Sequence, residues 1–236
     1  MTAATPTSSP EDDWEGLTFA ELRALSQQRR AELWADIPDW AERGTAVGGE
    51  PYARLVDALR DTRDAIADAR LDEDACAYLS ERLEEVTAYV RALRALPGER
   101  VWANRFDLAA RGSPLPPALN ELRIDPDHGR VRAQVSFGTS YAGAGDAAHG
   151  GAVALLLDEL LGLASNAGRP PARTAYLHVD YRAIAPLNVP LIARARIERV
   201  EGRKRWVTGE LRRSDAPEQT VAEAEGLFVE LRPWHA

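Results

Sequence analysis

Cysteine is nearly absent from this chain of 236 residues, in which Cys76 is the only one. A single cysteine excludes a disulfide within the chain and is typical of proteins from a reducing compartment. Histidine is scarce as well, and its four positions lie too far apart to show the spacing of a zinc site. The sequence therefore predicts neither a disulfide nor a metal centre.

Long apolar runs and an excess of basic residues are also lacking. The most apolar run, residues 152–157, is much shorter than the ~20 residues that a membrane-spanning helix needs. The first residues show no basic start and no apolar stretch of a secretory signal. The 29 Lys and Arg against 37 Asp and Glu leave a net charge of −8, which argues against binding to nucleic acid phosphates. We expect a cytoplasmic protein that binds neither membranes nor nucleic acids.

The N-terminal part of the chain has two different compositions. Residues 1–13 are small, polar and acidic, which is typical of a disordered lead, whereas residues 14–98 show helical spacing of apolar side chains. Thr18 and Glu21 have the spacing of a capping box at the start of a first helix, which we expect to extend to Pro38. Two further helices, at about 51–66 and 76–93, should form an antiparallel hairpin. The second has a heptad seam made of Cys76, Leu79, Leu83, Val86, Val90 and Leu93.

The pattern changes after Pro97-Gly98, and residues 99–236 are expected to form an α+β domain. Short segments alternate between apolar and polar residues, and they are joined by turns too short for parallel crossovers. One segment, 149–168, is apolar almost all round, as a centrally buried helix is. We therefore predict an antiparallel sheet wrapped around one long helix. The expected strands are 122–124, 131–137, 174–184, 191–201, 205–213 and 220–231.

Two adjacent carboxylates, Asp158 and Glu159, interrupt the apolar helix. A buried carboxylate without a cationic neighbour is costly, so such a residue is exposed, paired or functional. One interpretation is that either of them faces solvent or a subunit interface. The other interpretation is that Asp158 is a general base or nucleophile beside a pocket and that Glu159 contacts the substrate.

The start of the same helix is the second candidate site. Gly150 and Gly151 let a substrate approach the backbone, and the free N–H groups of a first helical turn can bind an oxyanion. His149 is either a plain helix cap or a group that binds substrate. Nine positions separate His149 from Asp158, which places them roughly 13 Å apart on opposite faces of the helix. If both act in one reaction, a second copy of the chain must supply one of them.

The His-Gly-Gly triplet, its spacing to Asp158, the following Gly162 and the segment TAYLHVDYRAIAPLNVPL resemble the PaaI-type (4HBT-like) acyl-CoA thioesterases of the hotdog superfamily. The resemblance covers about residues 115–232. It implies a hotdog fold, a homodimer or dimer of dimers, and hydrolysis of an acyl-CoA or related acyl thioester without metal or redox cofactor.

The resemblance also implies roles for single residues. Asp158 would be the catalytic carboxylate of one subunit, and the Gly150 amide would be the oxyanion donor of the other. His149 would orient the thioester, and Thr174 stands where relatives have a Ser or Thr that helps to hold the attacking water. A basic turn could contact the phosphates of coenzyme A or could be a solvated hairpin turn. It consists of Arg203, Lys204 and Arg205.

Other interpretations of these residues were weighed. Gly143, Gly145 and Ala148 satisfy a dinucleotide-binding fingerprint, but the later strands lack the helical crossovers of that fold. Ser140 lies in an incomplete nucleophile elbow, and a hotdog dehydratase would need a different second motif. A more serious alternative is a non-catalytic hotdog protein that binds an acyl-CoA or an acyl chain.

Overall fold

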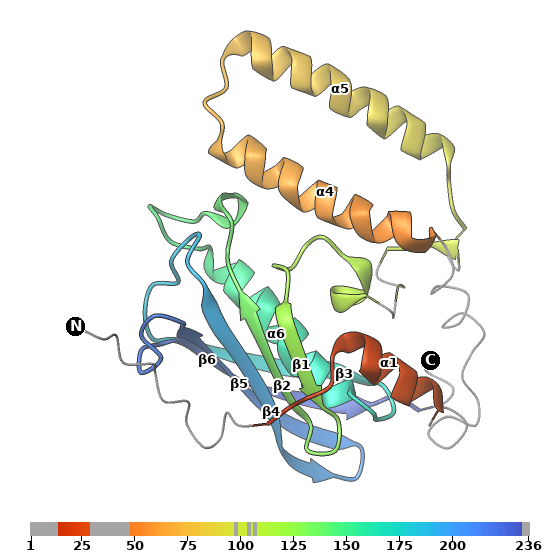
Figure 1. Ribbon diagram of the computed structural model, residues 1–236, viewed down its shortest axis with the longest axis vertical. Coiled ribbons are helices and arrows are strands. Elements are labelled where there is room, and N and C mark those ends of the chain that lie inside the picture. Colours follow the sequence, from red (N-terminus) through yellow and green to blue (C-terminus); the bar gives the residue numbers. More distant parts are fainter. Residues whose placement is uncertain (1–13, 29–47, 97–98, 103–104, 106–107, 233–236) are drawn as a thin grey trace.

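A computed structural model describes residues 14–28, 48–96, 99–102, 105 and 108–232 (Figure 1). The predicted disordered lead, the predicted helix beyond Gln28 and the predicted boundary at Pro97-Gly98 lie outside these residues. Among the described residues, three α-helices precede the sheet in the chain, and a fourth packs against it. Their bounds are Phe19–Gln28 (α1), Gly49–Asp68 (α4), Glu73–Ala92 (α5) and Gly150–Asn166 (α6).

All neighbouring strands of the sheet are antiparallel, as the short connections predicted. The order across the sheet is β1-β2-β4-β5-β6-β3, so β3 forms one edge. The α+β hotdog architecture is thus confirmed: one antiparallel sheet wraps around one long helix (Figure 1). The strands are Asn120–Asp125 (β1), Arg130–Val135 (β2), Ala172–Tyr181 (β3), Leu191–Glu201 (β4), Lys204–Arg213 (β5) and Thr220–Glu230 (β6).

The main core lies between α6 and the inner face of the sheet. Glycine at position 209 lets the helix approach closely, because a Cβ there would lie only 2.5 Å from Leu161 Cδ1. Burying each large apolar side chain stabilises the fold by about 1.5–3 kcal/mol. The apolar residues of the helix without exposed surface are Leu156, Leu157, Leu160, Leu161 and Ala164.

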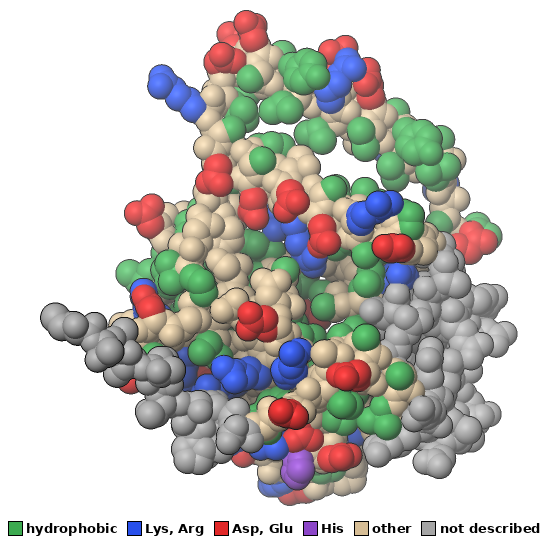
Figure 2. Space-filling view, viewed as in Figure 1, with side chains coloured by type: hydrophobic (Ala, Val, Ile, Leu, Met, Phe, Trp, Pro, Cys, Tyr) green, Lys and Arg blue, Asp and Glu red, His purple; other side chains and the backbone are tan. Residues whose placement is uncertain are grey.

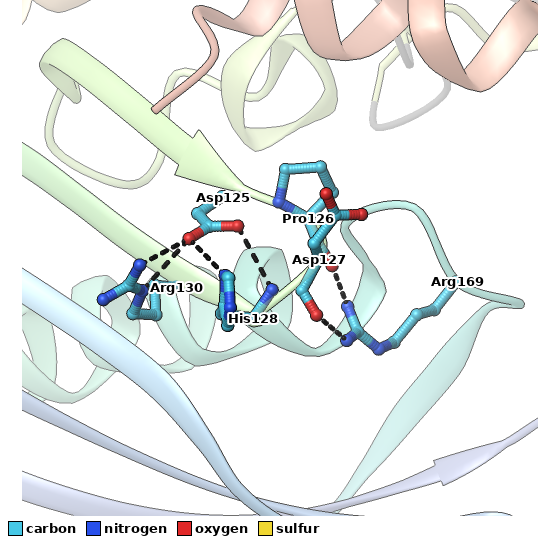
Figure 3. A network of polar contacts seen from close by, with 6 residues as sticks. All are labelled: Asp125, Pro126, Asp127, His128, Arg130 and Arg169. Carbon is cyan, nitrogen blue, oxygen red and sulfur yellow. Dashed lines mark hydrogen bonds and ion pairs between the residues drawn. The ribbon is translucent and has the colours of Figure 1, made fainter. Parts of the chain in front are cut away.

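The turn between β1 and β2 is fixed by one carboxylate (Figure 3). Asp125 accepts hydrogen bonds from the Arg130 guanidinium, at 2.7 Å from Nη2, and from the His128 N–H and Nδ1. Partial burial would raise the pKa of Asp125, but these hydrogen bonds lower it below its usual value. Arg169, which follows α6, donates to the Pro126 carbonyl at 2.6 Å. The turn is thereby attached to the end of the central helix.

The predicted helix signals before the sheet are confirmed in part. Thr18 and Glu21 form the capping box, with Thr18 N–H donating to Glu21 Oε2 at 2.8 Å. Asp72 caps α5, and α4 and α5 run antiparallel (Figure 1). The heptad seam, however, is not packed within the described chain: α5 has no buried residue, and Leu83 and Val90 are 47% and 57% exposed. Figure 2 shows hydrophobic side chains along this helix at the surface.

Candidate active site

The N-terminal end of α6 is capped by a histidine. His149 precedes the helix, and its Nδ1 accepts a hydrogen bond from the Gly151 N–H at 3.0 Å. Because Nδ1 is an acceptor, the neutral ring carries its proton on Nε2, which can donate from an exposed side chain. The Gly150 N–H is a second donor, and no group in the described part of the chain accepts from it. Two donors therefore lie at this helix end.

The end of β3 holds the first turn of α6 in place. The Tyr181 hydroxyl donates to the Gly150 carbonyl at 2.8 Å. A Cβ on Gly150 would lie 3.4 Å from that hydroxyl oxygen, so the glycine leaves the contact uncrowded. Tyr181 was not among the predicted site residues, although the Asp-Tyr-Arg segment that carries the resemblance contains it. This residue is a further candidate for fixing the amide donors.

The turn before α6 is a small hairpin. The Tyr141 carbonyl accepts from the His149 N–H at 2.8 Å. Ala142 and Ala148 pair across the turn as an antiparallel bridge. The conformation of this turn consequently sets the direction of the His149 ring and of the Gly150 N–H.

Helix α4 holds the other end of the same turn. Arg63 Nε donates to Ser140 Oγ at 2.8 Å, and its guanidinium lies 4.3 Å from the centroid of the Tyr141 ring. The Asp64 carboxylate accepts from the Ser140 N–H at 3.1 Å and from the Ser140 hydroxyl. A side chain at Gly138 would overlap that carboxylate. The helical region before the sheet is therefore part of the structure around the candidate site.

Asp158 lies beside the edge strand. Thr174, near the start of β3, donates from Oγ1 to Asp158 Oδ1 at 2.9 Å. The Asp158 side chain is half-buried, while Thr174 is exposed. The structure thus brings together a carboxylate and a hydroxyl that are sixteen residues apart in the sequence. A carboxylate held on a rigid helix in this way can act as a general base or a nucleophile.

Glu159 faces a different environment from its neighbour. It lines a cavity of about 240 Å³ between α4, the segment 108–120 and α6. Burial raises the pKa of the Glu159 carboxyl; Arg111 opposes this shift and Asp158 adds to it. Ligand pockets usually measure ~300–1,000 Å³, so this cavity has room for part of a ligand only. Its apolar walls include Val56, Leu108, Leu119 and Leu156.

The segment that closes this cavity has an unusual backbone. Ala110 and Arg111 adopt left-handed conformations, with φ of 51° and 52°, before Gly112 at 73°. Each such non-glycine residue costs ~1–3 kcal/mol unless its surroundings hold it. Here α4 supplies that support, because the Tyr52 hydroxyl donates to the Gly112 carbonyl at 3.1 Å. Arg60 Nη2 donates to the next carbonyl, that of Ser113, at 2.9 Å.

The predicted site residues fall into three groups. His149, Gly150 and Gly151 form the helix end, and Asp158 lies with Thr174 further along the helix on another face. The basic turn is a third group at the far end of α6. Within it, Arg205 is buried and donates to the Ser165 and Pro170 carbonyls and to Glu230, so it braces the end of α6. The other two members, Arg203 and Lys204, are exposed.

None of the described helices is sufficiently long and apolar to cross a membrane. In the same part of the chain, no cluster of three or more His, Cys, Asp or Glu side chains is arranged to hold a metal ion.

The candidate site coincides with a known family model. Residues 145–218 match the model 4HBT, thioesterase superfamily. This range contains α6, β3, β4 and β5, and with them the His149 and Asp158 groups. A crystal structure of a thioesterase superfamily protein is also similar, with a TM-score of 0.61 and 28% identity. The alignment covers 77% of this chain and 92% of that chain. The aligned share of this chain is larger than the sheet domain alone. The matched region is thus similar to thioesterase-superfamily domains, and it has the hotdog fold.

The relatives among curated proteins are acyl-coenzyme A thioesterases. The chain is 33% identical over 85 residues to acyl-coenzyme A thioesterase THEM4 of Xenopus laevis. It is 33% identical over 86 residues to the protein of the same name from Bos taurus. Each alignment covers 36% of this chain, and 38% and 34% of the two relatives, respectively. The chain therefore shares about a third of the length of these relatives, and the similarity is distant.

Proposed function

We propose that this protein hydrolyses acyl-CoA, or a related acyl thioester, to the free acid and the thiol, as PaaI-type thioesterases do. The observation that carries the proposal is the hydrogen bond from Thr174 on the edge strand to Asp158 on α6. The second half of the site is the N-terminal end of the same helix, where the Gly150 N–H and the His149 ring can donate. The 4HBT match and the distant THEM4 relatives support the same reaction. A thioester is reactive enough for one carboxylate and one or two oxyanion donors to hydrolyse it.

The active site is shared between two copies of the chain. His149 and Asp158 lie roughly 13 Å apart on opposite faces of one rigid helix, so a single copy cannot bring them together. The edge position of β3 supports pairing with a second copy, because an edge strand presents unpaired N–H and C=O groups. Such a dimer has two equal sites, each with Asp158 from one copy and the helix end from the other.

The reaction follows from these positions. The Asp158 carboxylate either takes a proton from water, so that hydroxide attacks the thioester carbonyl carbon, or attacks that carbon itself. Thr174 Oγ1 orients the carboxylate or the water. The carbonyl oxygen becomes an oxyanion and accepts hydrogen bonds from Gly150 N–H and His149 Nε2–H of the other copy. The carbon–sulfur bond then breaks, and the thiolate takes up a proton. If Asp158 is the nucleophile, water then hydrolyses the mixed anhydride that it forms, which releases the free acid and restores the carboxylate.

The first test is thiol release from short, medium, long and aromatic acyl-CoAs. Asp158→Ala should lower kcat by about 10²–10⁴-fold, the usual contribution of a positioned acid or base. Glu159→Ala is the comparison at the adjacent carboxylate, and because Glu159 faces a different cavity it should lower kcat far less than Asp158→Ala does. Binding of coenzyme A, measured by calorimetry, should persist in both variants.

The same experiment separates the non-catalytic alternative. If the wild type binds acyl-CoA but releases no thiol from any of them, the protein is an acyl-binding hotdog protein. If Asp158→Ala retains the wild-type kcat, Asp158 has no part in the chemistry.

A further inference from the structure

The cavity of about 240 Å³ beside α6 contains a carboxylate without a partner. Among the described residues, none donates a hydrogen bond to Glu159 or forms an ion pair with it. The side chain is half-buried, and burial disfavours its charge. Glu159 is thus neither fully exposed nor paired, which leaves a functional role as the remaining interpretation of this carboxylate.

The fold maintains this cavity at a cost in stability. Ala110 and Arg111, in the segment that closes it, have left-handed backbone conformations. Tyr52 and Arg60 of α4 hold this segment through hydrogen bonds to two of its carbonyls. A cavity with apolar walls also lowers stability, because its side chains pack against fewer neighbours. Both costs are offset when a ligand binds in the cavity and contacts these walls.

The cavity adjoins the proposed reaction site. Glu159 follows Asp158, and neighbouring side chains of a helix point about 100° apart, so the two carboxylates lie roughly 5–10 Å from each other. Burial lowers the pKa of Arg173, and the positive charge of Arg111 nearby lowers it further. The same Arg111 acts on Glu159. Because Arg173 precedes Thr174, which donates to Asp158, the segment that closes the cavity also passes beside the Asp158 site.

We propose that the cavity binds the far end of the acyl group and that Glu159 selects acyl chains with a hydroxyl group at that end. This inference rests on the proposed hydrolysis, in which the thioester carbonyl lies at Asp158. A hydroxyl group can donate to the carboxylate and can accept from its protonated form. A carboxylate on the chain would be repelled by Glu159, and an ammonium group would lie near the charge of Arg111.

The test compares acyl-CoAs that differ only at the far end of the chain. Chains of six and eight carbons carry a methyl, hydroxyl, amino or carboxyl group there, and kcat/KM is measured by thiol release. At one of these lengths the wild type should favour the hydroxyl over the methyl end by about tenfold or more, the usual effect of a hydrogen bond to a charged group.

Replacing the carboxylate should remove this selectivity. Glu159→Leu should use the methyl end at least as well as the hydroxyl end, whereas Glu159→Gln, which keeps an acceptor oxygen, should retain part of the preference. The ratio of two substrates on one variant does not depend on the amount of folded protein. The matched control is Glu84→Leu, at an exposed position of α5, which should keep the wild-type ratio.

Calorimetry in the Asp158→Ala background measures binding without turnover. There the hydroxyl chain should bind about tenfold more tightly than the methyl chain, and adding Glu159→Leu should abolish the difference. A wild type that releases no thiol from any acyl-CoA would overturn the proposed hydrolysis, while this comparison would still decide whether the cavity selects a hydroxyl group.

A second variant tests whether the chain enters the cavity at all. Ala53 of α4 lines the cavity, so Ala53→Leu narrows it without changing Glu159. It should lower kcat/KM for eight-carbon chains far more than for acetyl-CoA, with folding checked by circular dichroism. Equal effects on both would overturn the proposal. So would equal use of hydroxyl and methyl ends, a preference for the amino or carboxyl end, or a hydroxyl preference that persists in Glu159→Leu.

Discussion

Glu159 is a carboxyl group whose charged form is disfavoured by its surroundings in the fold. Burial raises its pKa above the usual value, so the folded protein holds this proton more tightly than the unfolded chain. The stability that the neutral form provides is complete below the ordinary glutamate pKa of about 4.3, and it is lost as the pH rises through the raised pKa. Deprotonation of Glu159 therefore lowers the free energy of unfolding.

Replacing Glu159 by glutamine should consequently stabilise the protein at neutral pH and have no effect at about pH 4. The measurement is thermal unfolding of wild type and Glu159→Gln between pH 4 and 8. Glu84→Gln, at an exposed position of α5, is the control and should shift the melting temperature at neither pH. An equal shift for Glu159→Gln at both ends of the range would contradict the role of burial.

Single residues also mark where the sequence was insufficient. Asp158 and Glu159 are equivalent in the sequence, as neighbours in one apolar helix. The structure separates them, because Asp158 meets Thr174 of β3 whereas Glu159 faces α4 and the segment 108–120. That segment has no periodic pattern, so the sequence could not indicate that it closes a cavity over one of the two carboxylates.

At the scale of elements, α4 has a role that follows from its contacts. Asp64 and Arg63 bind Ser140, and the turn from Ser140 leads to the helix end with His149. Loss of the Asp64 carboxylate should let this turn move, and the oxyanion donors should lose their fixed direction. Because the donors act most strongly in the transition state, the loss should lower kcat more than it raises KM.

The corresponding prediction is that Asp64→Ala lowers kcat about tenfold in thiol release and changes KM little. The control is Asp61→Ala, an exposed residue one turn earlier on α4. Asp64→Asn, which keeps one acceptor oxygen, should retain more of the rate. A wild-type kcat for Asp64→Ala with a lower melting temperature would mean that the residue only stabilises the fold.

The elements differ in how well the sequence predicts them. Strands such as β2 were predicted because alternate residues are buried, and α6 was predicted because its sequence is apolar almost all round. The packing of the α4–α5 hairpin was not predicted. Helix α4 turns Tyr52, Val56 and Arg60 to the sheet domain and leaves Leu55 and Leu59 52% and 43% exposed. Hydrogen bonds to loop carbonyls set the orientation of α4, and the spacing of apolar residues gives no information about such bonds.

At the scale of the whole molecule, a shared site makes a quantitative prediction. Asp158→Ala and His149→Ala should each be nearly inactive when pure. In a mixed dimer of the two, one site has both substitutions, while the other has Asp158 from one chain and His149 from its partner. That second site is intact, so each mixed dimer keeps about half of the wild-type activity.

Unfolding and refolding an equimolar mixture should thus give about a quarter of the wild-type thiol release, since about half of the dimers are mixed. Mixing the two variants without dissociation is the control and should recover nothing until subunits exchange. If both residues acted within one chain, every site in the mixture would carry one substitution and no activity would return. The recovered fraction therefore reports directly on whether the edge strands bring two copies of α6 together around each substrate.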